Sequence, residues 1–408
     1  MDASRVLKSV DASKDEMVST LSELCKIPAI PPESGGEGEA DKFALLADIL
    51  DDAGLPKGRD YPSKDKRVPG GKRHNLVVRM KGESAVGRIW VVSHVDIVPP
   101  GEQSLWKTDP YKPVVKGGKI YGRGTEDNGQ AMVTSLYAAK ALLDCGAIPK
   151  RDVMVAFVSD EEVGSRHGIQ HIISEGIVKP DDLVVVPDSG SPNGQYIEVV
   201  EKSHLQLRLT VRGKQCHASR PNKGINAYRA ASAYVTEATD MLYAKYDRRD
   251  RLFQPPYSTF EPTKKHANVP NVNTIPGEDV SFFDYRVLPG EDLDAILEDL
   301  KDLGRKHGRS SGARFDIETV SVSEAAPATP VGSPVVKALS ASIKAVKGVP
   351  AKPLGIGGGT CAAYFRRAGI PAAVWATIDE KAHEPNEYAV VANLVSDAKV
   401  FAHMFLNA

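Results

Sequence analysis

Residues 88–96 read Arg-Ile-Trp-Val-Val-Ser-His-Val-Asp, a short apolar run that ends in polar side chains. A run this short and this rich in β-branched residues is typical of a strand buried on both faces of a sheet. Residues 152–159 and 182–187 repeat the pattern, and residues 131–143, which precede the first of these two runs, have helical periodicity. The alternation of strands and helices predicts an α/β domain with a mixed, largely parallel sheet flanked by helices.

The middle of the chain has a different pattern, in which the strands are apolar on one side only. Residues 204–211 alternate polar and apolar side chains, and two long helical segments separate them from further strands at 280–287 and 314–320. After residue 330 the apolar α/β pattern returns. We therefore expect a catalytic, metal-binding domain formed by residues 1–201 plus 323–408, interrupted by an α+β lid at 202–322.

Composition argues against several classes of protein. The 408 residues contain 52 basic and 53 acidic side chains, for a net charge of −1. Nucleic-acid and anionic-membrane partners are not expected, because both select a basic surface. No stretch approaches the roughly 20 apolar residues of a membrane span, and the charged start at Met1–Lys8 lacks a signal-peptide pattern. These features predict a cytoplasmic enzyme. The four cysteines form no C-x-x-C pair, so any metal site must use histidines and carboxylates.

Polar side chains follow each predicted strand of the larger domain. His94 and Asp96 follow the first, Asp160-Glu-Glu162 the second and Asp188 the third, while His383 follows the strand at 372–376. Asp127 lies in the loop that opens the helix at 131–143. Because ligands bind at the carboxyl ends of strands in open α/β sheets, we expect these side chains to converge.

Converging carboxylates need compensating positive charge. Two carboxylates 4 Å apart repel by roughly 4 kcal/mol at an effective dielectric constant near 20. Two divalent cations would supply the missing charge, and a mixture of histidine and carboxylate ligands suits zinc, with cobalt or manganese as alternatives. His167 and His171 also have metal-ligand spacing on a helix, but no glutamate follows the first of them, so we interpret them as structural.

The sequence motifs around these residues resemble those of the M20 metallopeptidase family, which includes acetylornithine deacetylases, succinyl-diaminopimelate desuccinylases, carboxypeptidase G-type enzymes and dipeptidases. His94-Val-Asp96 resembles the H-x-D motif of the family, and the segment from Asp160 to Ser165 resembles D-E-E-x-G-S. Gly122-Arg-Gly-x-x-Asp127 resembles G-R-G-x-x-D-x-K-G, although Asn128-Gly-Gln130 lacks the usual lysine. His383-x-x-Asn-Glu387 resembles the terminal histidine motif.

The resemblance implies a role for each of these residues. Asp127 would bridge two metals, with His94 and Asp188 completing one site and Glu162 and His383 the other. Asp96 would orient His94 through its second ring nitrogen. Glu161, which is free of the metals, would be the general base that takes a proton from a metal-activated water.

The resemblance extends to the predicted insert, which is similar to the lid of the family. Gly213-Lys-Gln-Cys-His217-Ala-Ser resembles a lid motif whose histidine reaches a partner subunit, and it implies a homodimer formed through the lid. His217 would then bind the developing oxyanion. Four residues are candidates for substrate binding: Asn273 and Arg286, which is suited to a carboxylate, and Gly358 and Thr360 in a glycine-rich turn. A structural strand-end histidine and a surface ion pair are the alternatives for His217 and Arg286.

Two functional hypotheses share this machinery. The first is a deacylase acting on small N-acyl amino acids, and the second is a dipeptidase or carboxypeptidase acting on short peptides. They differ in what fills the lid pocket, and the sequence does not rank their substrates. A third hypothesis, a binding protein that kept the fold but lost catalysis, would require loss of a ligand or of Glu161, and all are present.

Overall fold

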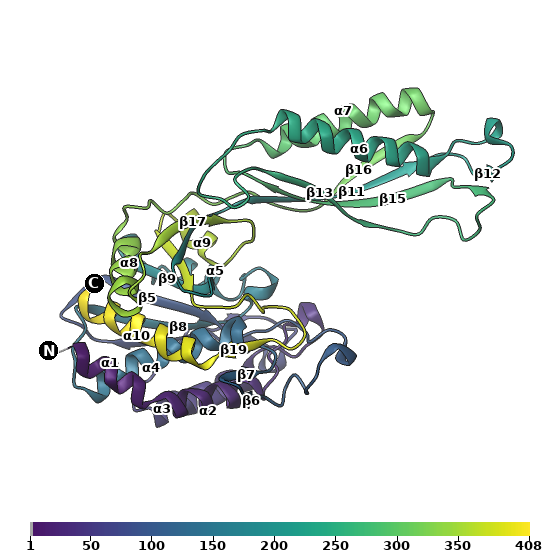
Figure 1. Ribbon diagram of the computed structural model, residues 1–408. Coiled ribbons are helices and arrows are strands. Elements are labelled where there is room, and N and C mark those ends of the chain that lie inside the picture. The colour runs from purple at the N-terminus through teal and green to yellow at the C-terminus, as the bar shows by residue number, and fades with distance from the viewer. Residues whose placement is uncertain (1–2) are drawn as a thin grey trace. The chain divides into compact units, whose positions relative to one another are not determined.

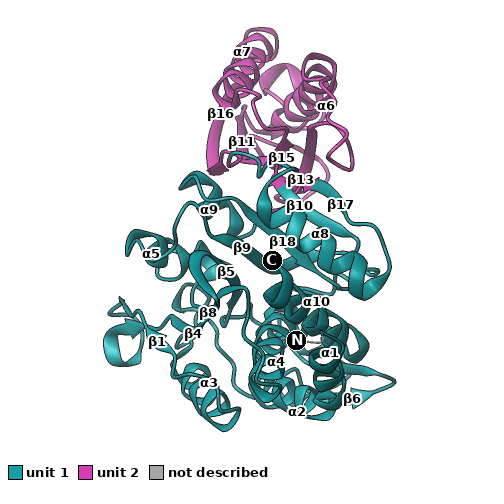
Figure 2. Ribbon diagram, turned by 90° about the vertical axis from the view of Figure 1, so that its left-hand side faces the viewer, with its two compact units in different colours: residues 1–199, 327–354, 360–408 teal, residues 200–326, 355–359 magenta. Residues whose placement is uncertain are grey.

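The computed structural model describes residues 3–408, which form two compact units (Figure 2). Unit 1 contains the chain up to Val199 together with Pro327–Leu354 and Thr360–Ala408. Unit 2 contains Val200–Ala326 and Gly355–Gly359. Met1 and Asp2, on which part of the expectation about the chain start rests, lie outside the described residues.

Unit 1 is built on an eight-stranded mixed sheet, which confirms the predicted fold class. Its central strands β8, β5, β9 and β18 run parallel, and β4 and β10 pair antiparallel on either side of them. In order across the sheet the strands are β1 (Arg59–Asp60), β4 (Leu76–Met80), β8 (Arg151–Val158), β5 (Ser84–His94), β9 (Leu183–Gly190), β18 (Ala372–Ala376), β10 (Tyr196–Glu201) and β17 (Lys352–Ile356).

Helices cover both faces of this sheet, so its central strands are buried on both sides as their sequences predict (Figure 1). On one face Trp90, Val92 and Val184 pack against Ile169 of α5 and Phe365 of α9. The helices of unit 1 are α1 (Ala3–Ala12), α2 (Lys14–Cys25), α3 (Ala40–Asp52), α4 (Gln130–Asp144), α5 (Ile169–Ser174), α8 (Pro334–Lys347), α9 (Ala362–Arg367) and α10 (Val391–Asn407).

Two small sheets complete unit 1. The first pairs β2 (Ser63–Lys64) with β3 (Lys72–Arg73), and the second joins β6 (Val114–Lys116), β7 (Lys119–Tyr121) and β19 (Tyr388–Val390). The pairing of β7 with β19 is antiparallel, with Tyr121 opposite Tyr388. It brings the loop that precedes α4, which carries Asp127, next to the segment that follows His383.

Unit 2 is a four-stranded antiparallel sheet packed against two helices (Figure 1). The strand order is β13 (Thr259–Lys265), β15 (Glu278–Val287), β11 (Ser203–Arg212) and β16 (Arg314–Ser323). Helices α6 (Ala227–Lys245) and α7 (Leu293–Ser311) bury one face, and β12 (Cys216–His217) pairs with β14 (Thr274–Ile275). The sequence prediction omitted β13, because Pro262 and two lysines interrupt its apolar pattern. Such residues are tolerated at a sheet edge, where β13 lies.

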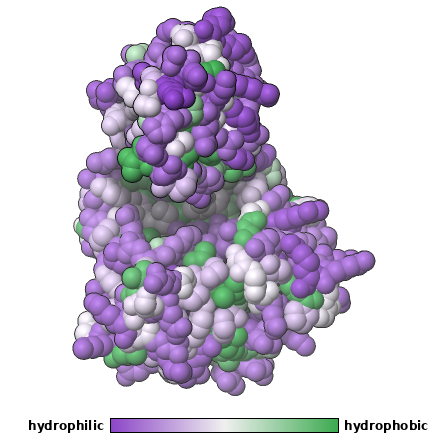
Figure 3. Space-filling model, turned by 90° about the vertical axis from the view of Figure 1, so that its right-hand side faces the viewer, coloured by the Kyte–Doolittle hydropathy of each residue, from purple (hydrophilic) through white to green (hydrophobic). Residues whose placement is uncertain are grey.

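Hydrophilic side chains cover most of the face drawn in Figure 3, and hydrophobic residues on it form small separate patches. Among residues 3–408, no helix combines the length and the apolar composition that crossing a bilayer requires.

Candidate metal centre

The carboxyl ends of the parallel strands bring the predicted metal ligands together. His94 is the last residue of β5, and Asp188 lies near the end of β9. Glu162 lies in a turn, Glu161–Val163, directly after β8, and His383 lies in the segment after β18. Asp127 comes from the loop that leads into α4. All five therefore lie within unit 1.

The five side chains form two groups that share Asp127. In the first group, His94 Nε2 lies 2.9 Å from Asp127 Oδ1 and 3.3 Å from Asp188 Oδ1. In the second group, His383 Nε2 lies 3.1 Å from Asp127 Oδ2 and 3.1 Å from Glu162 Oε2. Each oxygen of Asp127 thus faces a different histidine, which is the arrangement a bridging carboxylate requires.

The geometry of each group fits a divalent cation. The candidate ligand atoms of each group all lie within 4.8 Å of one another. Ligand atoms about 2.1 Å from a tetrahedral zinc ion stand roughly 3.4 Å apart, close to the separations observed here. Two imidazoles and three carboxylates form a donor set suited to zinc, cobalt or manganese.

The pKa shifts of these groups reflect the negative charge gathered at the site. Contacts with Asp127 and Glu162 raise the pKa of His383 to about 10. Burial lowers the pKa of His94, but its contacts with Asp127, Asp188 and Asp96 outweigh burial and raise it well above its ordinary value. The pKa of Asp127 is correspondingly lowered, because the two histidines outweigh the effect of its burial. The negative charge of the carboxylates thus favours positive charge at the site, which bound cations would provide.

Glu161 stands next to this cluster but belongs to neither group of candidate ligands. Its side chain is half-buried, and burial raises its pKa well above the ordinary value, with a further contribution from the negative charge of Asp188. A carboxylate with a raised pKa is suited to accept a proton during catalysis. Its role as the general base remains a prediction.

Asp96 lies at the site and contacts the second ring nitrogen of His94. His94 Nδ1 lies 2.9 Å from the backbone carbonyl oxygen of Asp96, whereas the Asp96 carboxylate lies 3.5 Å away. That carboxylate instead accepts hydrogen bonds from the backbone N–H groups of Glu161 and Glu162, each at 3.0 Å. Asp96 therefore orients the histidine chiefly through its main chain and fixes the Glu161–Glu162 turn through its side chain.

Asn128 is a site residue that the sequence did not reveal. Its Nδ2 donates to Asp188 Oδ1 at 2.8 Å and to the carbonyl oxygen of Pro187 at 3.0 Å. The amide thereby holds a candidate ligand that lies 60 residues away in the chain. The only signal in the sequence was its position directly after Asp127.

The missing lysine of the motif has a steric explanation at Gly129. A Cβ atom on Gly129 would lie 2.4 Å from the carbonyl oxygen of Gly124 and 2.6 Å from Leu21 Cδ1. The first of these neighbours is backbone, which cannot rotate away. No side chain fits here without moving the loop that carries Asp127.

We expect Gly129→Ala to lower the free energy of unfolding by about 1–3 kcal/mol, the usual cost of overpacking. Gly332→Ala is the matched control, since a Cβ there meets no atom within 4 Å, and a change below about 0.5 kcal/mol is expected. Denaturant unfolding of both variants measures the difference. Equal stability of the two would contradict the steric explanation.

Two further carboxylates, Glu126 and Glu387, were not assigned a role from the sequence. Both are buried. Glu126 accepts a hydrogen bond from a backbone N–H of the segment that carries His383, and Glu387 accepts hydrogen bonds from backbone N–H groups of the loop that carries Asp127. In the sequence, Glu387 was recognisable only as the last residue of the terminal histidine motif.

The candidate substrate residues are distributed over both units. In unit 2, Arg286 donates to Asp284 at 2.6 Å and to the carbonyl oxygen of Gly357 at 3.0 Å, next to Gly358. Thr360 belongs to unit 1 and is buried, and its hydroxyl oxygen accepts a hydrogen bond from the backbone N–H of Ala362. The ion pair of Arg286 agrees with the structural alternative considered for it, and its role toward a substrate remains a prediction.

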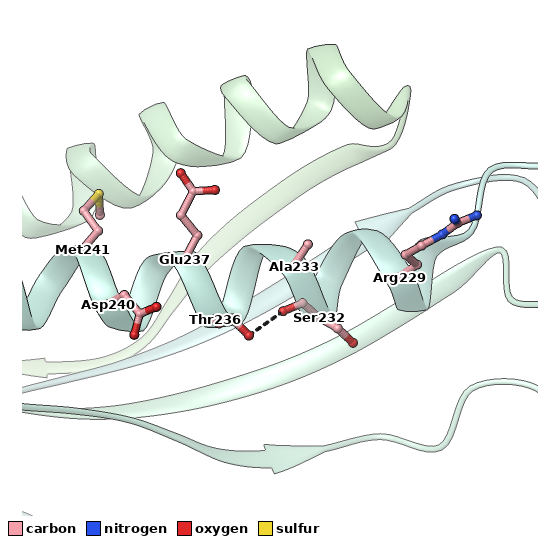
Figure 4. A pocket seen from close by; sticks show the side chains of 7 residues that line it. All are labelled: Arg229, Ser232, Ala233, Thr236, Glu237, Asp240 and Met241. Carbon is pink, nitrogen blue, oxygen red and sulfur yellow. Dashed lines mark hydrogen bonds between the residues drawn. The ribbon is translucent and has the colours of Figure 1, made fainter.

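The other two candidates, His217 and Asn273, are exposed residues of unit 2. His217 Nδ1 lies 2.8 Å from Ser219 Oγ, and the backbone carbonyl oxygen of Asn273 accepts a hydrogen bond from Ala218. A groove of about 810 Å³ elsewhere in unit 2 is lined only by α6, between Arg229 and Met241 (Figure 4), and contains none of the candidate site residues.

Comparison with known proteins gives a consistent result over nearly the whole chain. The profile of peptidase family M20/M25/M40 matches residues 90–407. An uncharacterised metallohydrolase of Methanocaldococcus jannaschii is 37% identical over 406 residues, which cover 95% of this chain and 98% of the relative. A succinyl-diaminopimelate desuccinylase of Acinetobacter baylyi is 26% identical over 384 residues, covering 93% of this chain and 94% of the relative.

Solved structures share the fold. Human carnosine dipeptidase 1 matches with a TM-score of 0.76 at 17% identity, covering 99% of this chain and 98% of that one. An M20 family metallo-carboxypeptidase from Sulfolobus solfataricus matches with a TM-score of 0.73 at 20% identity, covering 96% of this chain and 98% of that one.

Proposed function

The chain belongs to peptidase family M20/M25/M40, and from this premise we propose that it is a dinuclear zinc enzyme that removes the acyl group from N-acyl amino acids. Membership of the family makes it a metal-dependent hydrolase. The dinuclear mechanism is supported by one observation above all, the two ligand groups that share Asp127 with Glu161 beside them.

The first group, His94, Asp127 and Asp188, would hold one cation, and the second group, Asp127, Glu162 and His383, would hold the other. Zinc is the ion we expect, and the same donor set also accommodates cobalt or manganese. When bound, the cations would lower the pKa of a water molecule and polarise the scissile carbonyl.

Glu161 would perform the proton transfers of the reaction. Its carboxylate accepts a proton as water attacks the carbonyl carbon, and it returns that proton to the leaving nitrogen as the C–N bond breaks. The Asp96 carboxylate fixes the backbone of Glu161, so the base is held in place without itself being a ligand. His217 of a partner subunit would donate a hydrogen bond to the oxyanion, which makes a homodimer through unit 2 part of the proposal.

Relatives from several bacteria that are named succinyl-diaminopimelate desuccinylases support a deacylase over a peptidase. The fold likeness to carnosine dipeptidase 1 and to a metallo-carboxypeptidase keeps a dipeptidase or carboxypeptidase as the second candidate. Both reactions break an amide bond, and both use the same ligands and base.

A substrate panel distinguishes the two candidates. We expect kcat/KM for an N-succinyl or N-acetyl amino acid to exceed that for any dipeptide by at least about tenfold, which corresponds to 1.4 kcal/mol of transition-state binding. The full chain would be loaded with Zn²⁺, Co²⁺ or Mn²⁺ in turn and assayed with each class. Preference for dipeptides would replace the deacylase by the peptidase, and the absence of hydrolysis in every class would contradict both.

A further inference from the structure

Two loops of unit 1 carry Asp127 and His383, two of the three ligands of the second group. Each loop also contains one buried carboxylate that accepts hydrogen bonds from the backbone of the other loop. The loop 122–127 contains Asp127, and the segment 379–387 contains His383. Glu126 from the first loop is 4% exposed, and Glu387 from the second is fully buried.

Glu126 fixes the segment just before His383. Its Oε1 accepts a hydrogen bond from the backbone N–H of Asp379 at 2.7 Å, and its Oε2 accepts one from Lys381. His383 follows two residues later with a φ of 63°, in the left-handed region that non-glycine residues seldom occupy. Its side chain is 56% exposed, so packing alone constrains it weakly and the backbone must hold it in place.

Glu387, which belongs to the segment that carries His383, in turn fixes the loop around Asp127. Its Oε1 accepts hydrogen bonds from the backbone N–H groups of Glu126 at 2.9 Å and of Asp127 at 3.0 Å. Its Oε2 accepts hydrogen bonds from the backbone N–H of Gly124 at 3.0 Å and from Arg123 Nη1 at 2.6 Å. Every partner is a donor, so the site requires a group that only accepts.

We propose that Glu126 and Glu387 are positioning residues that form a reciprocal clasp, and that this clasp sets the affinity of the metal position formed by Asp127, Glu162 and His383. The inference rests on the metal centre proposed above and extends it to residues that touch no metal. Its physical basis is preorganisation, because a cation binds more tightly to ligands that are already held in place.

We expect different effects on metal affinity when each of the two carboxylates is replaced by glutamine. Glu126→Gln places an amide N–H₂ against a backbone N–H of Asp379 or Lys381, so it disturbs only the His383 side. We expect it to weaken the second metal position about 10–100-fold, the usual effect of residues that orient ligands, and to leave the first unchanged. Glu387→Gln disturbs the backbone of Asp127, which both positions share, and is expected to weaken both.

Asp152→Asn is the matched control. Asp152 is also a buried carboxylate in unit 1 that accepts hydrogen bonds from an arginine, Arg79, and from a backbone N–H, that of Gly82. It lies in β8 at the end of the strand opposite Glu161. Its replacement is expected to lower thermal stability without changing either metal affinity.

The test is a Co²⁺ titration of each metal-free full-length variant by calorimetry, together with amide hydrogen exchange of the same metal-free proteins. We expect faster exchange at residues 379 and 381 in Glu126→Gln, weaker binding of the second Co²⁺ only, and recovery of turnover at excess Co²⁺. Wild-type affinities in Glu126→Gln, or an equal loss in Asp152→Asn, would overturn the clasp.

The result also separates the clasp from the proposed function. If the wild-type chain binds two Co²⁺ and Glu126→Gln binds both equally well, only the clasp is wrong. If the wild-type chain itself binds fewer than two Co²⁺, the dinuclear centre is wrong and the clasp with it. Should Glu387→Gln fail to fold, Glu126→Gln decides the question alone, since the Glu126 carboxylate accepts its hydrogen bonds from Asp379 and Lys381 and the substitution keeps the backbone N–H that donates to Glu387.

Discussion

Replacing Glu161 by glutamine is expected to lower kcat by about 10²–10⁴-fold, the contribution of a positioned general base, while both metals remain bound. Glutamine keeps the size of the side chain but cannot accept the proton that attacking water must lose. The backbone of residue 161 would stay fixed by Asp96. Steady-state kinetics on the best substrate of the panel, with metal content measured on the same sample, tests this prediction.

Glu175→Gln is a suitable control, because Glu175 is an exposed residue at the end of α5 in the same unit. It removes the same charge and should leave kcat unchanged. Turnover at the wild-type rate in Glu161→Gln would show that another group takes the proton. Loss of metal from this variant would show instead that Glu161 is a ligand.

Asp127→Ala should remove both metals, because its two oxygens belong to different ligand groups. We expect the affinity of both positions to fall by more than about 100-fold, since the loss of a ligand exceeds the 10–100-fold effect of the residues that orient one. Turnover should fall with metal content. Elemental analysis after dialysis against a limiting metal concentration measures the outcome.

Asp188→Ala is the comparison for Asp127→Ala, because Asp127 belongs to both ligand groups and Asp188 to one of them. Asp188 belongs only to the group with His94, so this variant should retain the cation held by Glu162 and His383. If Asp127→Ala and Asp188→Ala lose the same amount of metal, Asp127 does not bridge two positions.

The strands and most of the ligands could be predicted because their signals are local. The run at 88–93 is apolar and β-branched, and parallel strands place His94, Glu162 and Asp188 at one edge whatever the details of packing. Asp127 does not follow a strand. It was expected beside the others because it lies in the loop that opens the helix at 131–143, and the resemblance to a family implied only its bridging role.

The supporting contacts could not be predicted, because they join distant parts of the chain. The hydrogen bond between Glu126 and Asp379 spans 253 residues, and no periodicity relates the two. The contact of His94 with the main chain of Asp96 depends on the shape of a turn, which sequence spacing does not specify. The same limit applies to Asn128, whose partner Asp188 lies on another strand.

Anomalous X-ray diffraction from crystals of the Zn²⁺-loaded chain would show whether Asp127 bridges two metal ions. We predict two zinc peaks roughly 3.5–4 Å apart, the spacing typical of two-metal sites, one between His94 and Asp188 and the other between Glu162 and His383, with Asp127 between them. One peak, or two peaks that do not share Asp127, would contradict a dinuclear hydrolase built on these residues.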